Sequence, residues 1–168
     1  MVTFRLAGSV PHELMDRWKQ ELQRLTREQA QAERRRRVER YLDTGAGPVW
    51  LSDPKLTELV QNALLHFDGR RYVLLAWAIM ANHVHAVFSP IAPHDVSGIL
   101  QSWKSFTGTM ANRRLGRMGA FWDRDYFDRF IRNDRHLAAA IGYIEMNPVK
   151  AGLCGSPEEW PWSSATRR

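Results

Sequence analysis

Two histidines separated by one residue are the first feature of this chain that suggests chemistry. His83 and His85 lie in the stretch 74–89, LLAWAIMANHVHAVFS, whose two apolar runs are typical of two strands joined by a tight turn. Side chains alternate between the faces of a strand, so both imidazoles are expected on one face, next to the turn. Two neutral imidazoles at this spacing can bind one divalent metal ion. A bare His-x-His pair is more often two polar residues on a wet sheet face, so other residues must decide between these interpretations.

A tyrosine and an asparagine near the end of the chain form a second candidate pair. A last helix is predicted to begin near residue 133 or 134 and to end at Pro148. Tyr143 and Asn147 are four residues apart, so they emerge on neighbouring turns of one helix face. The apolar positions lie on another face, which can pack on a sheet. The face with Tyr143 would then point sideways and could line a cleft. Taken singly, Tyr143 is more typical of a rim aromatic, and Asn147 before a proline is more typical of an ordinary helix end.

The elements that must position these residues follow from the hydrophobic pattern. Residues 2–7 alternate as a half-buried strand. A helix with an apolar stripe up to Leu25 follows Pro11, and its charged continuation predicts a solvated helical extension at about 26–43. Further helices are predicted after Asp53 and Asp95, and a fourth strand around Tyr126–Arg132. The order predicts an α+β fold, a ferredoxin-like βαββαβ arrangement with a four-stranded antiparallel sheet, helices on one face, an enlarged first crossover and an extra C-terminal helix carrying the tyrosine.

Length and composition limit the class of protein. The chain has 168 residues, which suits a single domain, 1–168, with a C-terminal tail at about 149–168. The only cysteine, Cys154, excludes an intrachain disulfide and suits a reducing, cytoplasmic location. No apolar run approaches the length of a membrane span, and the first ten residues do not resemble a signal peptide. The net charge of +6 favours a polyanionic partner, most simply nucleic acid.

Five segments in a fixed order carry a resemblance to a known family. They are NHVH (82–85), WKSFT (103–107), FWDRDYFDRFIR (121–132), YIEMNPVKAGL (143–153) and WPWSS (160–164). With these segments the chain resembles the REP-associated tyrosine transposases, which belong to the HUH single-strand endonucleases together with the single-tyrosine insertion-sequence transposases. The likeness covers most of the chain. One departure is Ala81, where the family pattern has proline, and this change alters the turn without affecting a ligand.

The resemblance implies roles for the paired residues. His83 and His85 match the pair that holds Mg²⁺ or Mn²⁺, Tyr143 matches the nucleophile, and Asn147 matches the third metal ligand. The family cuts a stem-loop in single-stranded DNA, with the tyrosine joined to the 5′ phosphate and a free 3′ hydroxyl left for rejoining. The chemistry suits these residues, because a tyrosine with an ordinary pKa near 10 needs a polarised target, which a metal-bound phosphate provides. The covalent link conserves bond energy, and the sequence accordingly has no nucleotide-binding GK[ST] loop.

Basic residues indicate where DNA would lie. Those predicted to contact DNA are Arg34, Arg35, Arg36, Arg37, Lys104, Arg113, Arg114 and Arg129. The arginines at 34–37 are also compatible with a solvated charged helix face that forms intrahelical pairs with glutamates. Aromatic residues among the arginines of 121–132 suit stacking on single-stranded bases, or alternatively core packing.

The sequence therefore predicts a metal-dependent, sequence-specific endonuclease and strand transferase that acts on hairpins of the repetitive extragenic palindrome (REP) type, in the cytoplasm and associated with the nucleoid, as a monomer or homodimer. An autonomous insertion-sequence transposase with the same chemistry remains an alternative, as does a hairpin-binding protein without catalysis. A hydrolase of small phosphoesters has less support, because no Asp/Glu-rich cluster accompanies the histidine pair.

Overall fold

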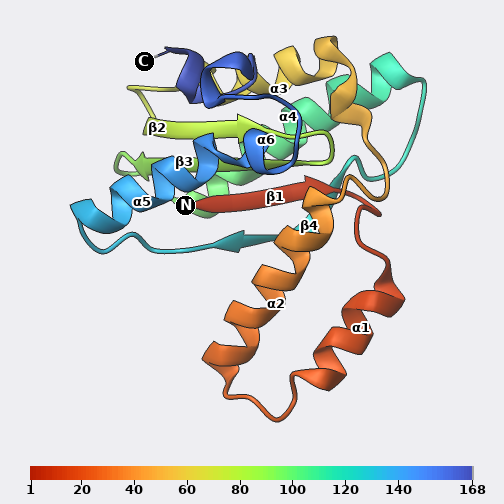
Figure 1. Cartoon of the computed structure of the whole chain (residues 1–168). Helices are drawn as coiled ribbons and strands as arrows, with labels where there is room; N and C mark the ends of the chain where they lie inside the picture. Colours follow the sequence, from red (N-terminus) through yellow and green to blue (C-terminus); the bar gives the residue numbers. More distant parts are fainter. Residues whose placement is uncertain (168) are drawn as a thin grey trace.

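The hairpin around the two histidines forms half of a four-stranded antiparallel sheet. The computed structural model describes residues 1–167, and its strands have the order β2-β3-β1-β4 (Figure 1). Met80, Ala81 and Asn82 form the turn between β2 and β3, as predicted. The strands are β1 (Val2–Leu6), β2 (Tyr72–Ile79), β3 (His83–Pro90) and β4 (Trp122–Asp128). Their order is the one that two interleaved β-α-β units produce, so the predicted mixed fold with a four-stranded antiparallel sheet is confirmed.

One face of the sheet carries the main apolar core. Phe4, Val84 and Trp122 point toward this face, where aromatic rings including Trp103 pack against them. Two helices cover it, α3 (Pro54–His66) and α4 (Val96–Leu115). Asp53 and Asp95 cap these helices through their side chains, as their positions in the sequence predict.

The opposite face is covered by the last helices, α5 (Asp134–Glu145) and α6 (Asn147–Lys150), which lie in front of the sheet in Figure 1. Ala140 and Ile144 of α5 pack on Ala76, Ala78 and Val87 of the hairpin. The prediction of helices on one face only is therefore wrong. The two alanines of β2 are small enough for a helix to approach the second face closely.

The charged N-terminal segment folds into a helical hairpin, which projects past the β4 edge of the sheet (Figure 1). Its helices are α1 (His12–Glu21) and α2 (Arg27–Asp43). The predicted extension is thus a separate helix, because Thr26 forms a capping box that starts α2. Leu25, assigned to the apolar stripe of the first helix, is exposed in the turn. At the other end of α2, Val38 and Leu42 are buried and fix this helix against the body of the protein.

Two predicted boundaries differ from the observed ones. The fourth strand ends at Asp128, four residues earlier than predicted, because its partner β1 is short and Val2 pairs with Asp128. The last helix breaks after Glu145, and Pro148 stands in the first turn of α6, where a missing N–H costs no hydrogen bond.

The C-terminal tail closes the β2 edge of the sheet. The Ile79 N–H donates to the carbonyl of Trp162 at 2.9 Å, and the Trp160 indole donates to the Ile79 carbonyl at 3.0 Å. The tail contains the short 3₁₀ turns η2 (Pro157–Glu159) and η3 (Ser164–Arg167), and a further turn, η1 (Trp50–Ser52), precedes α3. The last residue of the predicted tail, Arg168, lies outside the described residues. Within 1–167, no helix is long and apolar enough to cross a membrane.

Candidate active site

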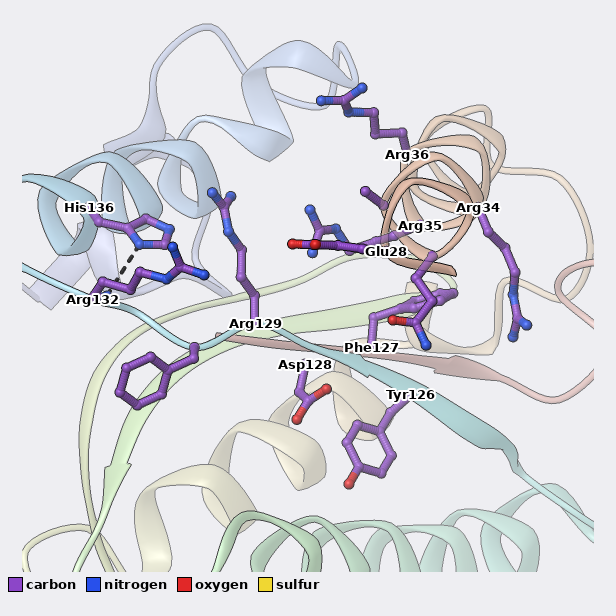
Figure 2. A pocket seen from close by; sticks show the side chains of 13 residues that line it. Glu28, Arg34, Arg35, Arg36, Tyr126, Phe127, Asp128, Arg129, Arg132 and His136 are labelled. Atoms are coloured by element: carbon purple, nitrogen blue, oxygen red, sulfur yellow. Dashed lines mark hydrogen bonds between the residues drawn. The ribbon is translucent and has the colours of Figure 1, made fainter. Parts of the chain in front are cut away.

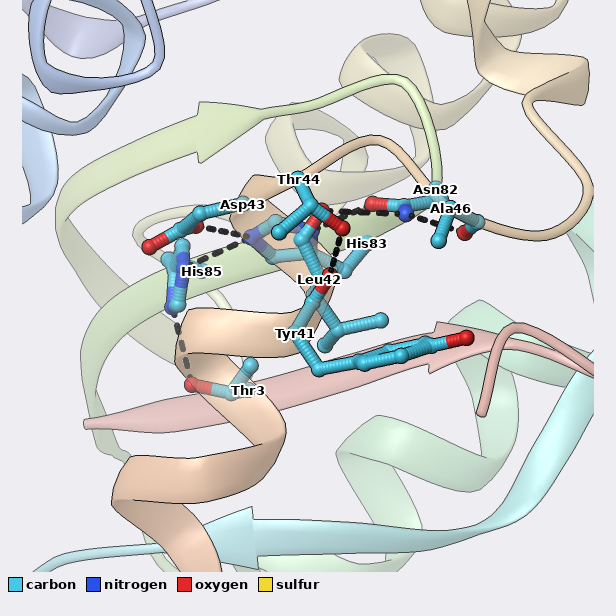
Figure 3. Close-up of polar contacts among 9 residues, drawn as sticks. All are labelled: Thr3, Tyr41, Leu42, Asp43, Thr44, Ala46, Asn82, His83 and His85. Carbon is cyan, nitrogen blue, oxygen red and sulfur yellow. Dashed lines mark hydrogen bonds and ion pairs between the residues drawn. The ribbon is translucent and has the colours of Figure 1, made fainter. Parts of the chain in front are cut away.

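The two histidines converge on one point of the sheet face that α5 covers. The Nε2 atoms of His83 and His85 are 2.9 Å apart, and the rings are nearly perpendicular (Figure 3). Both side chains are fully buried. Adjacent ligands of an octahedral ion with bonds of about 2.1 Å stand about 3 Å apart, so this separation matches two nitrogens that share one cation.

The turn of the hairpin determines the tautomer of the first imidazole. The Asn82 amide nitrogen donates to the carbonyl oxygens of Leu42 and Ala46, at 3.1 and 3.2 Å. Its oxygen therefore faces His83 Nδ1 at 2.7 Å and accepts a hydrogen bond from it. With the proton held on Nδ1, the Nε2 of His83 presents a lone pair toward His85, as a metal ligand must.

A threonine of β1 orients the second imidazole. The Thr3 hydroxyl lies 2.8 Å from Nδ1 of His85 (Figure 3). A hydroxyl can donate or accept, so it supports either tautomer of this ring. When Thr3 accepts from Nδ1–H, both Nε2 atoms are bare and available to one cation. When Thr3 donates, His85 Nε2–H can instead donate to His83.

Helix α5 brings Tyr143 to the same face. Its ring packs edge-on against His85, with centroids 5.9 Å apart, and the ammonium of Lys150 lies over the ring, 4.9 Å from its centroid. The side chains of Asn147 and Glu39 lie near the Tyr143 hydroxyl and act on its ionisation. The structure thus brings together the histidine pair, the tyrosine and, beside the tyrosine, the asparagine, which the sequence had placed in one site.

The buried Asn147 side chain adjoins the tyrosine, and its amide nitrogen has no hydrogen-bond partner among the described residues. Within 1–167 the histidine pair is not completed by a third His, Cys, Asp or Glu in ligand geometry. Two imidazoles with a neutral amide nearby fit a divalent cation that keeps positions open for phosphate oxygens.

Two carboxylates of α2 also lie at the site, and neither was predicted from the sequence. Asp43 Oδ1 lies 3.8 Å from His83 Nε2, and Glu39 lies near the Tyr143 hydroxyl. Each follows a buried apolar residue of α2 by one position, Val38 and Leu42 respectively. This spacing was the available signal, because residues four apart that flank a buried stripe point toward the same neighbour.

Burial dominates the acid–base properties of these groups. It lowers the pKa of His83 well below its usual value and that of His85 to about 3, so both rings are neutral at physiological pH. Burial raises the pKa values of Glu39 and Asp43. The pKa of the Tyr143 phenol is also raised, first by burial and then by the charges of the two carboxylates. The tyrosine is therefore protonated at neutral pH and must lose its proton before or during any attack.

A basic groove of about 700 Å³ runs along the same side of the molecule (Figure 2). It lies between α2 and the segment from β4 to α5, and Phe127 forms part of its lining. The Arg34 guanidinium lies over the Phe127 ring, 5.8 Å from its centroid. The other charged and aromatic residues that line the groove are Glu28, Arg35, Arg36, Tyr126, Asp128, Arg129, Phe130, Arg132 and His136. Cationic and aromatic side chains in one groove suit the backbone and bases of a single strand.

Half of the cations predicted to contact DNA line the groove. Arg34, Arg35, Arg36 and Arg129 line the groove. Arg37 points away, toward Glu21 and Glu33, with which it forms ion pairs.

The three cations predicted on α4 lie elsewhere. Lys104 donates to the carbonyl of Arg124 at 3.0 Å, and Arg114 pairs with Asp53 at 3.0 Å. Arg113 is exposed in the last turn of the same helix. Because α4 covers the core face, the structure places none of the three with the histidine pair. Arg132, one of the arginines of 121–132 that were expected to suit single-stranded DNA, also lines the groove.

The sequence of this chain is similar to those of known transposases. The family model described as "Transposase IS200 like" matches residues 53–147. A putative REP-associated tyrosine transposase of Haemophilus influenzae is 39% identical over 56 residues, which are 33% of this chain and 32% of that protein. The REP-associated tyrosine transposase of Escherichia coli K12 is 24% identical over 115 residues, 66% of this chain and 65% of that protein. The matches thus span about a third and just under two thirds of these relatives.

A solved structure shares the fold. A structure described as a REP-associated tyrosine transposase bound to a REP hairpin superposes with a TM-score of 0.61 and 18% identity, over 99% of this chain and 75% of that one.

Proposed function

This chain belongs to the family of IS200-like transposases, as the order of its motifs predicted, and on that basis we propose that it is a metal-dependent, single-stranded DNA endonuclease and strand transferase. Its proposed substrates are hairpins of the REP type, and its proposed intermediate is a 5′-phosphotyrosine. The choice of substrate is supported by the REP-associated relatives and by the hairpin bound in the structure with the same fold.

One observation carries the proposal: the phenol of α5 lies against the paired imidazoles of β3. The Tyr143 ring is 5.9 Å from His85, whose Nε2 is 2.9 Å from that of His83. A nucleophile and a pair of cation ligands on one face can act on the same phosphate. The basic groove adjoins this face, since Arg35, which lines the groove, lies 3.9 Å from Glu39, near the tyrosine.

Each residue has a defined task in this proposal. His83 and His85, with Asn147 beside them, would hold Mg²⁺ or Mn²⁺, and the bound cation would polarise a non-bridging phosphate oxygen. Asn82 and Thr3 hold the imidazoles in orientation. The Tyr143 oxygen attacks phosphorus and the 3′ oxygen leaves, which yields the phosphotyrosine and a free 3′ end. Arg34, Arg35, Arg36 and Arg129 would neutralise phosphates of the strand leading to the site.

The burial of both histidines favours a second candidate, a hairpin-binding protein without catalysis. A phosphate reaches fully buried imidazoles only when α2 or α5 moves aside. A protein locked in this closed arrangement would bind hairpin DNA equally well in EDTA and would give no cleaved product.

A labelled hairpin oligonucleotide with a single-stranded flank separates the two candidates. The wild type with Mn²⁺ is expected to form a covalent adduct that survives denaturing electrophoresis, and Tyr143→Phe is expected to form none. Tyr126→Phe, which removes the hydroxyl of a β4 tyrosine that points away from α2 and packs partly on the core face, is the matched control and should still form the adduct (Figure 2). An adduct with Tyr143→Phe excludes this residue as the nucleophile. Hairpin binding without any adduct from the wild type favours the binding protein.

A further inference from the structure

Glu39 is a largely buried carboxylate that the roles assigned above leave unused. It lies on the half of α2 that is fixed by the buried residues Val38 and Leu42. Only 12% of its side chain is exposed, and its carboxyl group lies near the hydroxyl of Tyr143, on whose ionisation it acts. Carboxylates are seldom buried unless their charge is compensated, so the position calls for a physical explanation.

The charge of Glu39 is only partly compensated. The nearest cation is the Arg35 guanidinium, whose Nε lies 3.9 Å from Oε1, and Arg129 acts from across the groove. Asp43, one turn further along α2, opposes them. No hydrogen-bond donor reaches the buried Oε1 atom in the described part of the chain. This oxygen therefore keeps lone pairs free, next to a phenol that must lose a proton.

We propose that Glu39 is the catalytic base that accepts the phenolic proton of Tyr143 when the tyrosine attacks the phosphate. This inference rests on the function proposed above and assigns its proton transfer to a residue outside the family-model match, which begins at residue 53. The N-terminal helical hairpin is then part of the active site, not only a surface for DNA.

The step balances without any further reactant. The Tyr143 O–H bond breaks and its proton passes to the Glu39 carboxylate. The phenolic oxygen forms a bond to phosphorus, the bond from phosphorus to the 3′ oxygen breaks, and that oxygen leaves with the electron pair and takes a proton from water. In the reverse direction a 3′ hydroxyl attacks the phosphotyrosine, and the protonated Glu39 returns its proton to the departing phenolate. The same carboxyl thus serves as base in cleavage and as acid in strand transfer.

The test measures the single-turnover rate of adduct formation on a labelled hairpin with Mn²⁺. Glu39→Gln keeps the size and polarity of the side chain and removes its capacity as a base. We expect the rate to fall about 100-fold or more, within the range of general-base catalysis. Glu33→Gln is the matched control, because Glu33 lies on the same helix but pairs with Arg36, Arg37 and Arg40. Its rate should equal that of the wild type.

A second arm distinguishes proton transfer from a structural role. The tyrosine at position 143 is replaced by 2,3,5-trifluorotyrosine, whose phenol ionises far more readily and needs no base. In this background Glu39→Gln should cleave within about tenfold of the protein that keeps Glu39. A carboxylate that only holds α2 in place would leave the defect unchanged.

Every outcome decides the proposal. A loss of rate that trifluorotyrosine restores supports it. A Glu39→Gln protein that cleaves as fast as the wild type, or faster, overturns it, because the carboxylate then only keeps the site closed. A defect that trifluorotyrosine does not relieve also overturns it. If the wild type forms no adduct, the proposed function is excluded, and with it the role of Glu39 as a base. Binding of the hairpin shows that a variant is folded. If Glu39→Gln does not bind the hairpin, Glu39→Asp, which has a shorter carboxylate, is measured with Tyr143 and with trifluorotyrosine in the same way.

Discussion

His83 and His85 point their Nε2 atoms at each other across 2.9 Å, and each ring is oriented by a different element of the fold. The turn residue Asn82 orients the first imidazole, and Thr3 of the neighbouring strand orients the second. Two nitrogens held this close, both buried, form either a shared hydrogen bond or two ligands of one cation. A cation would replace the shared proton between them.

Removal of either imidazole should abolish metal binding without abolishing DNA binding. We expect His83→Ala and His85→Ala to lose saturable binding of Mn²⁺, measured by electron paramagnetic resonance of the free ion, and to form no adduct with the hairpin. Hairpin affinity in EDTA should remain within about threefold of the wild type, because the groove cations supply the phosphate contacts. His66→Ala, at an exposed position of α3, is the control and should bind Mn²⁺ normally. Unchanged Mn²⁺ binding by His83→Ala would place the cation elsewhere.

The side chain of Asn82 should matter for stability as well as for orientation. Asn82→Ala leaves the carbonyls of Leu42 and Ala46 without their donor and His83 Nδ1 without its acceptor. A buried polar group left unpaired costs about 1–3 kcal/mol, so we expect the free energy of unfolding in urea to fall by about 2–3 kcal/mol. Asn62→Ala on the exposed side of α3 should change it by less than about 0.5 kcal/mol. Equal values for the two variants would mean that the amide of Asn82 contributes little.

Much of this site follows from local sequence patterns. The alternation around His83 and His85 predicts a hairpin with both rings on one face, and the spacing of Tyr143 and Asn147 predicts one helix face. Periodicity describes one element at a time, however. It does not show which face of the sheet a helix covers, so helices were predicted on one face only. The small side chains of Ala76 and Ala78 were the local hint.

Glu39 and Asp43 could not be found in this way, because their importance depends on contacts between distant parts of the chain. On a polar segment with few apolar residues, they read as part of a solvated surface. Their neighbours Val38 and Leu42 indicate that one side of the helix is buried, but not against which element. The fourth strand was misplaced for a similar reason, since its end is determined by the length of its partner β1.

Acid should destabilise the metal-free protein through the two imidazoles. Their pKa values are lowered in the folded state, so below the ordinary value of 6.5 the unfolded chain binds protons that the folded chain does not. The free energy of unfolding is therefore expected to fall between pH 7.5 and 5.5 in EDTA, by about 1.4 kcal/mol for each imidazole. The raised pKa values of Glu39 and Asp43 act in the opposite direction as pH falls, so the net loss is smaller than the sum for two rings.

Urea titrations at the two pH values measure this difference. His85→Gln removes one of the two titrating rings, so its stability should depend less on pH than that of the wild type, by about 1.4 kcal/mol over the same interval. A wild type equally stable at both pH values would show that the imidazoles already bind protons in the folded state.

Loss of an arginine from the groove and loss of an arginine from α4 are predicted to affect DNA binding differently. Arg35 and Arg129 line the groove next to the tyrosine, whereas Arg114 pairs with Asp53 on the helix that covers the core face. Loss of one phosphate contact should weaken binding of a single-stranded flank and reduce the slope of log affinity against log salt by about 0.7. We expect this for Arg129→Ala and not for Arg114→Ala, which carries the same change in net charge. Fluorescence anisotropy at several salt concentrations measures both quantities. If the two variants lose affinity equally, DNA is attracted by overall charge alone, and a strand that follows this groove to Tyr143 is no longer supported.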